Sequence, residues 1–146
     1  MKALVDTSIL LPALMTRHPN SKKCTEALRR IQEYYDVVVL NTHLAAELYA
    51  NLTRFPKGEI NPKAAAAMIR VLREKMEVVD LTMDDYMLAV DRCANKGLVS
   101  RVIYDALHLQ AAIKADVDVL YTENIRDFTR LLDDDDKVII RSLSEL

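Results

Sequence analysis

Five short apolar runs, separated by longer segments with helical periodicity, constrain what this chain can fold into. The runs span residues 3–5, 37–40, 78–79, 119–121 and 138–140. Consecutive apolar residues over such short lengths are typical of strands that are buried on both faces of a parallel sheet. Strands that alternate with helices pair in parallel through right-handed crossovers. The sequence therefore predicts an α/β fold of three layers, with a central, mainly parallel sheet of four to five strands flanked by helices.

The segments between these runs begin with helix-capping residues and continue with apolar residues at helical spacing. Ser21 is expected to cap a helix over residues 21–35, and Asn41 or Thr42 is expected to cap the next one. Thr82, followed three residues later by an aspartate, has the pattern of a capping box. The residues of these later two helices that are expected to face the core are Leu44, Leu48, Leu52, Met83, Tyr86, Met87, Val90 and Ala94.

Four further segments complete the predicted organisation. Residues 56–58 are expected to end the helix that Asn41 or Thr42 begins, and residues 125–132 to form a short helix. Residues 102–114 are apolar nearly all round, which indicates a helix packed against the sheet. The four consecutive aspartates at 133–136 are interpreted as a solvated loop before the last strand.

Size and composition exclude several classes of protein. A chain of 146 residues is long enough for one core, and we expect residues 1–146 to form a single domain. With only two glycines, Gly58 and Gly97, the chain has no glycine-rich loop for nucleotide phosphates. No apolar stretch reaches the ~20 residues that span a bilayer, and there is no leader-like segment. Cys24 and Cys93 lack CxxC spacing, so we expect reduced thiols in a cytoplasmic protein.

Acidic residues occur where the chain should return to one edge of the predicted sheet. Asp6 ends the first strand, Glu47 lies in the helix after the second strand, Asp105 lies in the first turn of the 102–114 helix, and Asp127 follows the fourth strand. The carboxyl ends of parallel strands border the crevice in which open α/β sheets bind ligands. Carboxylates that converge there repel one another unless a cation lies between them. We therefore expect these four residues to form a divalent-metal site.

Three of these acids also have a purely structural interpretation. Glu47 could pair with Arg54, and Asp127 could serve as a cap or a surface acid. Asp105 could be favoured by its place near a helix N-terminus, an effect of ~0.3–1 kcal/mol. That gain is too small for a deeply buried carboxylate, which is destabilising by several kcal/mol unless it is paired or binds a metal. Asp105 is therefore the strongest of the candidates.

The remaining polar residues near these acids favour phosphate chemistry with a hard cation. Thr122 ends a strand as Asp6 does, and its hydroxyl, with those of Thr7 and Ser8, is expected to orient water or phosphate. Oxygen ligands select Mg²⁺ or Mn²⁺ over zinc. Such sites activate water for in-line attack on a phosphodiester.

The three histidines are not expected to act in this site. His18 and His43 are interpreted as loop or cap residues. His108 lies three residues after Asp105 and could contact the site, but we expect it instead to be packed or to face solvent.

Four segments together resemble PIN-domain ribonucleases, and most closely the VapC-type toxins of prokaryotic toxin–antitoxin pairs. They are residues 4–8 (LVDTS), 45–48 (AAEL), 104–109 (YDALHL) and 120–128 (LYTENIRDF). The resemblance covers essentially the whole chain and implies a PIN-like fold. It also implies that Asp6, Glu47 and Asp105 bind one or two Mg²⁺ or Mn²⁺ ions and direct water at RNA.

The resemblance has one departure and two further implications. The position two residues after Thr122 often holds aspartate in the family but is Asn124 here, which leaves Asp127 as a possible replacement. An asparagine oxygen can bind a metal but adds no charge, so a second ion would be held weakly. The family further implies a homodimer and a cognate antitoxin that covers the active cleft.

Two other functions remain as alternatives to an endoribonuclease. Asn124 and the net charge of −2 are compatible with a PIN-like module that binds RNA or a protein without turnover. A phosphohydrolase of the haloacid-dehalogenase type also places an aspartate after its first strand, but it requires a second aspartate where this chain has Ser8. Because the net charge is negative, contact with RNA would need a local basic rim. The candidates for that rim are Arg17, Lys22, Lys23, Arg54 and Arg101.

Overall fold

The computed structural model describes residues 1–54 and 60–146, in which strands and helices alternate. The strands are β1 (Lys2–Val5), β2 (Val37–Asn41), β3 (Glu77–Val79), β4 (Val119–Tyr121) and β5 (Ile139–Arg141). The helices are α1 (Thr7–Leu14), α2 (Ser21–Tyr34), α3 (Thr42–Leu52), α4 (Pro62–Lys75), α5 (Met83–Asn95), α6 (Val102–Lys114) and α7 (Ile125–Leu131), and a 3₁₀ turn, η1 (Leu143–Glu145), ends the chain. No helix in this described part is long and apolar enough to cross a membrane.

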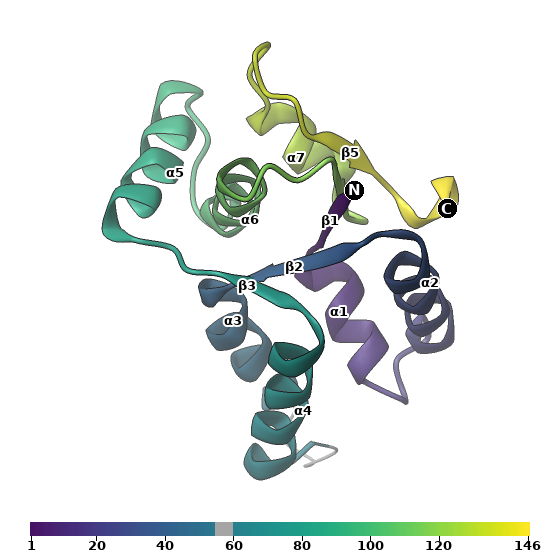
Figure 1. Ribbon diagram of the computed structural model, residues 1–146. Helices are drawn as coiled ribbons and strands as arrows, with labels where there is room; N and C mark the ends of the chain where they lie inside the picture. The colour runs from purple at the N-terminus through teal and green to yellow at the C-terminus, as the bar shows by residue number, and fades with distance from the viewer. Residues whose placement is uncertain (55–59) are drawn as a thin grey trace.

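The five strands form one parallel sheet in the order β3-β2-β1-β4-β5. Successive residues of a strand face opposite sides of it: Ala3 and Val5 belong to one hydrophobic cluster and Leu4 to the other. The first cluster is completed by α1 to α4 and the second by α5, α6 and α7, so helices cover both faces (Figure 1). The predicted three-layer α/β fold with a parallel sheet is confirmed.

The order of the strands reverses between β1 and β4, the two neighbours at the centre of the sheet. The chain leaves β1 into α1 on one face and leaves β4 into α7 on the other face (Figure 1). Open α/β sheets bind ligands at such a reversal, beyond the carboxyl ends of the strands. Asp6 and Thr122 directly follow β1 and β4, so both lie at this position.

Most of the predicted helix starts are present. The side chain of Asn41 accepts a hydrogen bond from the Leu44 amide at 3.0 Å and begins α3. Thr82 and Asp85 form a reciprocal capping box at the start of α5, and Gly97, with φ of +65°, follows its end. The prediction that Ser21 caps α2 is wrong, because Asn20 occupies that position and makes no side-chain capping bond. The predicted helix end at residues 56–58 lies outside the described residues.

The core-facing side of α5 differs from the prediction. Met83, Met87 and Val90, expected to be buried, are exposed, and Met83 keeps 70% of its surface accessible. The side that packs on α6 instead carries Asp85, Ala89 and Cys93. The acid is tolerated there because α6 supplies partners: Lys114 Nζ lies 2.6 Å from one Asp85 oxygen, and the Gln110 amide donates to the other at 3.2 Å.

The acidic segment at 133–136 is anchored rather than only solvated. Arg92 of α5 donates to Asp136 Oδ2 at 2.6 Å, to Asp133 at 3.0 Å and to the carbonyl of Leu131 at 2.8 Å. The Arg92 side chain is only 14% exposed. A charge so far from water requires this degree of hydrogen bonding, and the contacts fix the link between α7 and β5.

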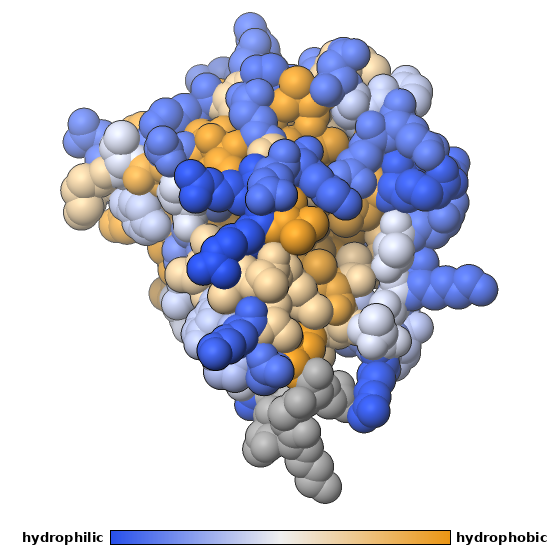
Figure 2. Space-filling model, turned by 60° about the horizontal axis from the view of Figure 1, so that its bottom comes forward, coloured by the Kyte–Doolittle hydropathy of each residue, from blue (hydrophilic) through white to orange (hydrophobic). Residues whose placement is uncertain are grey.

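The surface mixes apolar and charged side chains. On the face seen in Figure 2, apolar side chains gather in a central area that is bordered by hydrophilic ones. Apolar exposure of this kind is normal for folded proteins.

Candidate active site

Asp6 is almost completely buried at the junction of β1 and α1, with 1% of its surface exposed. As the N-cap of α1 it accepts hydrogen bonds from the backbone amide and the hydroxyl of Ser8, at 3.2 and 2.5 Å. Its second carboxyl oxygen accepts from Thr122 Oγ1 at 2.8 Å. Burial raises the pKa of the Asp6 carboxyl above its usual value, and these hydroxyl donors oppose that rise. Ser8 and Thr122 thus orient the carboxylate that the sequence placed at the centre of the site.

Glu47 projects from α3 and contacts His108 of α6. Nε2 of His108 lies 3.1 Å from Glu47 Oε2 and 3.2 Å from the hydroxyl of Thr7. Burial acts to raise the pKa of Glu47, but the hydrogen bonds from His108 and Thr7 outweigh it and bring the pKa below its usual value. Glu47 is therefore held as an oriented carboxylate by His108 and forms no ion pair with Arg54, the partner considered in its structural interpretation.

The orientation of His108 is fixed by Asn41. Because Oδ1 of Asn41 accepts from the Leu44 amide, its Nδ2 points the other way and lies 2.8 Å from Nδ1 of His108. An amide nitrogen only donates, so Nδ1 must accept and the ring proton sits on Nε2, toward Glu47. His108 is buried, as one reading of the sequence expected, but it is also an integral part of the site. The cap of α3 thereby determines the hydrogen bond that Glu47 receives.

Asp105 lies in the first turn of α6 and is only partly buried, so the deep burial considered from the sequence is not found. Burial is the largest cause of a rise in its pKa to about 7, and the negative charges of Asp6, Asp127 and Glu47 add to it. The charges of the other acids thus act on Asp105, but burial is the larger cause of the rise in its pKa.

The two candidates for the fourth position lie at the edge of this group. Asp127 of α7 pairs with Arg130, whose guanidinium lies 2.7 Å from Asp127 Oδ1, and both side chains are substantially exposed. Asn124 is exposed, and its side chain makes no capping bond at the start of α7. Its backbone amide donates to Thr122 Oγ1 at 2.9 Å. Within the described part of the chain, the side chains of Asp127 and Asn124 therefore lack an orienting contact of the kind that His108 makes to Glu47.

The chemistry of the donors fits a hard divalent cation. Asp6, Glu47, Asp105 and Asp127 offer only carboxylate oxygens, whereas Cys24 and Cys93 are buried in the two hydrophobic clusters. Among residues 1–54 and 60–146, no three His, Cys, Asp or Glu side chains stand close enough together to hold an ion as they are placed. A cation between the carboxylates would remove the repulsion that raises the pKa of Asp105.

A cleft of about 380 Å³ opens beside Glu47 and carries part of the expected basic rim. Arg54 and Arg101 line it, whereas Lys23 pairs with Glu123 at 3.9 Å and Arg17 and Lys22 do not line it. His43, which was expected in a loop or cap, lies in the first turn of α3 and also lines this cleft.

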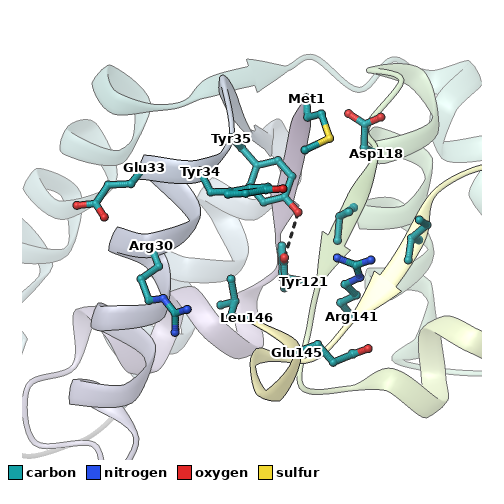
Figure 3. A pocket seen from close by; sticks show the side chains of 12 residues that line it. Met1, Arg30, Glu33, Tyr34, Tyr35, Asp118, Tyr121, Arg141, Glu145 and Leu146 are labelled. Carbon is teal, nitrogen blue, oxygen red and sulfur yellow. Dashed lines mark hydrogen bonds between the residues drawn. The ribbon is translucent and has the colours of Figure 1, made fainter.

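A larger cavity, of about 730 Å³, lies elsewhere, between α2 and the β4–β5 edge (Figure 3). Tyr35 and Tyr121 meet there through their hydroxyls at 3.0 Å. None of the four candidate acids lines it.

Comparisons with known proteins agree on the fold. A model of the PIN domain family matches residues 3–132. VapBC2 from Rickettsia felis, solved bound to a DNA fragment from their promoter, is 19% identical with a TM-score of 0.69 and covers 97% of this chain and 98% of that chain. VapBC-1 from nontypeable Haemophilus influenzae is 19% identical with a TM-score of 0.67 and covers 99% of both chains.

A third structure is that of a toxin with a named target. VapC20 from Mycobacterium tuberculosis, described as a Sarcin-Ricin loop cleaving toxin, is 17% identical with a TM-score of 0.67 and covers 81% of this chain and 86% of that chain. Among curated protein sequences, none matches significantly. Identities this low show a common fold. The family match, in contrast, spans most of the sequence and includes all four candidate acids. The chain therefore belongs to the PIN domain family.

Proposed function

We propose that this protein is an endoribonuclease that depends on Mg²⁺ or Mn²⁺ and acts as the toxin of a toxin–antitoxin pair. The observation that carries the proposal is the buried carboxylate of Asp6 at the carboxyl end of β1, held by hydrogen bonds from the hydroxyls of Ser8 and Thr122. The pKa of Asp105 rises to about 7, mainly through burial, and the negative charges of Asp6, Asp127 and Glu47 add to that rise. Carboxylates at the carboxyl edge of a parallel sheet supply the oxygen ligands that a divalent cation prefers. Membership of the PIN domain family and the similarity to VapC proteins support nuclease activity.

The residues of the site divide into three roles in this proposal. Asp6, Glu47 and Asp105 would hold the cation, and Asp127 or Asn124 would complete its ligands. When bound, the ion supplies a Lewis acid that activates water for attack on a phosphodiester. Ser8 and Thr122 hold the Asp6 carboxylate by hydrogen bonds from their hydroxyls, and His108 holds Glu47 in the same way. Thr7 lies against His108 and adds a further hydroxyl for water or phosphate.

Partners follow from the similar structures and belong to the same proposal. The structures from Rickettsia felis and Haemophilus influenzae are of VapBC complexes, and VapC20 is described as cleaving the Sarcin-Ricin loop. We therefore propose RNA as the substrate, a cognate antitoxin that covers the carboxylates, a homodimeric state and action in the cytoplasm.

The test is cleavage of a mixed pool of structured RNAs by the purified protein in Mg²⁺, Mn²⁺ or EDTA. Asp6→Asn and Asp105→Asn should each reduce cleavage at least a hundredfold, because each removes a charge that holds the cation. Asp91→Asn, at an exposed position on α5, serves as the matched control and should cleave like the wild-type protein. Equal cleavage in EDTA and Mg²⁺, or full activity in Asp105→Asn, would contradict the proposal.

A second candidate is a PIN-domain module that binds RNA or protein without turnover. It is favoured by the pairing of Asp127 with Arg130 and by asparagine at position 124, which together weaken the fourth ligand. Calorimetric titration with Mn²⁺, with and without RNA, and the cleavage assay together separate the two candidates. The binding module would retain RNA but would show no metal-dependent cutting. The haloacid-dehalogenase alternative loses its support, because the chain belongs to another family.

A further inference from the structure

The cleft beside Glu47 has the size and the lining of a ligand site. Its volume of about 380 Å³ lies between the end of α3 and the start of α6. Pockets for small organic groups have volumes of roughly 300–1,000 Å³. Because Glu47 itself lines the cleft, a group bound there would be adjacent to the proposed metal ligands.

One wall of the cleft presents a fixed aromatic surface. The rings of Tyr104 and His43 stack with centroids 5.1 Å apart and planes at 10°. The ring of Tyr86 packs edge-on against the ring of His43, with ring centroids 6.3 Å apart. Tyr104 nevertheless keeps 39% of its surface exposed. A ring that is backed on one face by His43 offers its other face for stacking, and an unpaired nucleobase is a flat group that stacks on such rings.

The lining of the cleft also carries positive charge. Arg54 follows α3 and Arg101 precedes α6, and neither makes an ion pair with any residue within 1–54 and 60–146. Arg92 and Lys114, in contrast, are both neutralised by aspartates. Guanidinium groups bind phosphate oxygens with matched geometry. Two arginines that form no ion pair among the described residues, next to an aromatic wall, therefore fit a nucleotide, base and phosphate together.

A buried nitrogen at the back of the cleft has no partner. Within the described residues, Nε2 of His43 is inaccessible and makes no hydrogen bond; the nearest acid, Glu47 Oε2, is 4.0 Å away. Folded proteins rarely leave a buried polar atom unsatisfied, and a bridging water or a bound group can supply the missing partner.

We propose that this cleft is a subsite for one unpaired nucleotide of an RNA strand, whose base stacks on Tyr104 and whose phosphate contacts Arg54 and Arg101. The inference rests on the proposed function and deepens it, because it places the RNA strand on the α3 side of the carboxylates. A paired base must leave its stack before it can enter such a site, which takes energy. The protein should therefore bind single-stranded RNA more tightly than the duplex of the same sequence.

The first experiment measures fluorescence anisotropy of a short, labelled, mixed-sequence single-stranded RNA with the full chain in EDTA, where cleavage is blocked. Loss of one base–aromatic stack weakens binding by ~5- to 100-fold. Tyr104→Ala and Tyr104→Leu should both show this loss, whereas Tyr104→Phe should bind within threefold of the wild-type protein. Tyr104→Leu preserves apolar packing on His43, so it separates stacking from damage to the fold. Tyr34→Ala, in the larger cavity of Figure 3, is the matched control.

The second experiment repeats the titration over a range of salt concentrations. Each phosphate contact with single-stranded RNA contributes about 0.7 to the slope of log Kd against log salt. Arg54→Ala and Arg101→Ala should each lower the slope by about this amount, while Tyr104→Ala should leave it unchanged. Lys137→Ala removes one charge near the far end of the sheet and should leave both affinity and slope unchanged.

Parallel cleavage assays separate this inference from the proposed function. If RNA is cut in Mg²⁺ but Tyr104→Ala binds as tightly as the wild-type protein, the subsite is wrong and the nuclease stands. If binding depends on Tyr104 but no metal supports cutting, the subsite stands and the nuclease fails. If the protein binds no RNA, both are overturned.

Discussion

His108 holds Glu47 through a single nitrogen: Nε2 lies 3.1 Å from Glu47 Oε2, while Nδ1 is occupied by the amide of Asn41 at 2.8 Å. The buried imidazole therefore connects the cap of α3 to a carboxylate farther along the same helix. Groups that orient metal ligands in this way change metal affinity or activity by ~10- to 100-fold when they are removed.

Replacement of His108 should reveal this positioning role. His108→Asn cannot reach Glu47 and should weaken Mn²⁺ binding and RNA cleavage by ~10- to 100-fold. His108→Gln places an amide nitrogen close to the position of Nε2 and should recover most of both. Calorimetric titration with Mn²⁺ and cleavage rates measure the effect. Equal losses in the two variants would show that His108 acts only through packing.

Asp105 should make the metal-free protein less stable as the pH rises. Its pKa of about 7 in the folded state lies above the usual value of 3.8, so between these pH values the folded state binds more protons than the unfolded state. The stabilisation of the folded state that is linked to protonation of Asp105 is therefore fully present below pH 3.8 and is lost as the pH rises through 7.

Asp105→Asn removes this dependence and should raise the melting temperature in EDTA at pH 7.5 by roughly 3 °C or more. Thermal unfolding of both proteins between pH 4 and pH 8 provides the measurement, with Asp91→Asn as the control. If the melting temperatures of the wild-type protein and Asp105→Asn change in parallel with pH, the assignment of the raised pKa to Asp105 is contradicted.

Thr122→Val should destabilise the protein by about 1–3 kcal/mol, the usual effect of leaving buried groups without hydrogen bonds. The buried hydroxyl donates to Asp6 at 2.8 Å and accepts from the amide of Asn124 at 2.9 Å, and valine can replace neither bond. Urea unfolding in EDTA measures the change. Thr129→Val, whose exposed hydroxyl bonds only within α7, should have a much smaller effect; a similar effect of both substitutions would argue against the Asp6 contact.

Arg92→Met should destabilise the fold by about 2–3 kcal/mol because it leaves Asp136 and a carbonyl without their charged donor. RNA binding and cleavage should remain intact, since Arg92 is remote from the cleft beside Glu47. Arg29→Met removes pairs with Glu26 and Glu33 on an exposed helix face and should change the unfolding midpoint little. The prediction fails if the two substitutions have equal effects on urea unfolding.

Local signals in the sequence were sufficient to predict most helices and strands, and to predict that Asp6 lies at the carboxyl edge of the sheet. The limits of α6 and β4 match the predicted residues 102–114 and 119–121, because apolar runs and capping residues act over a few positions. Asp6 could be placed at the crevice from the sequence because it directly follows a buried strand. The last strand is shifted by one residue from 138–140, and η1 was not predicted.

Only the tertiary structure decided which face of α5 is buried. The apolar residues around Met87 have a helical period, but a period does not say which neighbour will cover them. Asp85 is buried instead because Lys114 of α6 satisfies it, and small residues beside it permit close packing.

The hydrogen bonds of the site were likewise beyond the sequence. Asn41 is one of two candidates for a helix cap in the sequence, and His108 is a neighbour of Asp105, yet nothing local relates residues 67 positions apart. Their contact arises because β2 and α6 pack together in the fold. The sequence determined which ligand types are present and at which strand ends they stand. Their orientation, and the rise in the pKa of Asp105, come from distances and burial that exist only when the chain is folded.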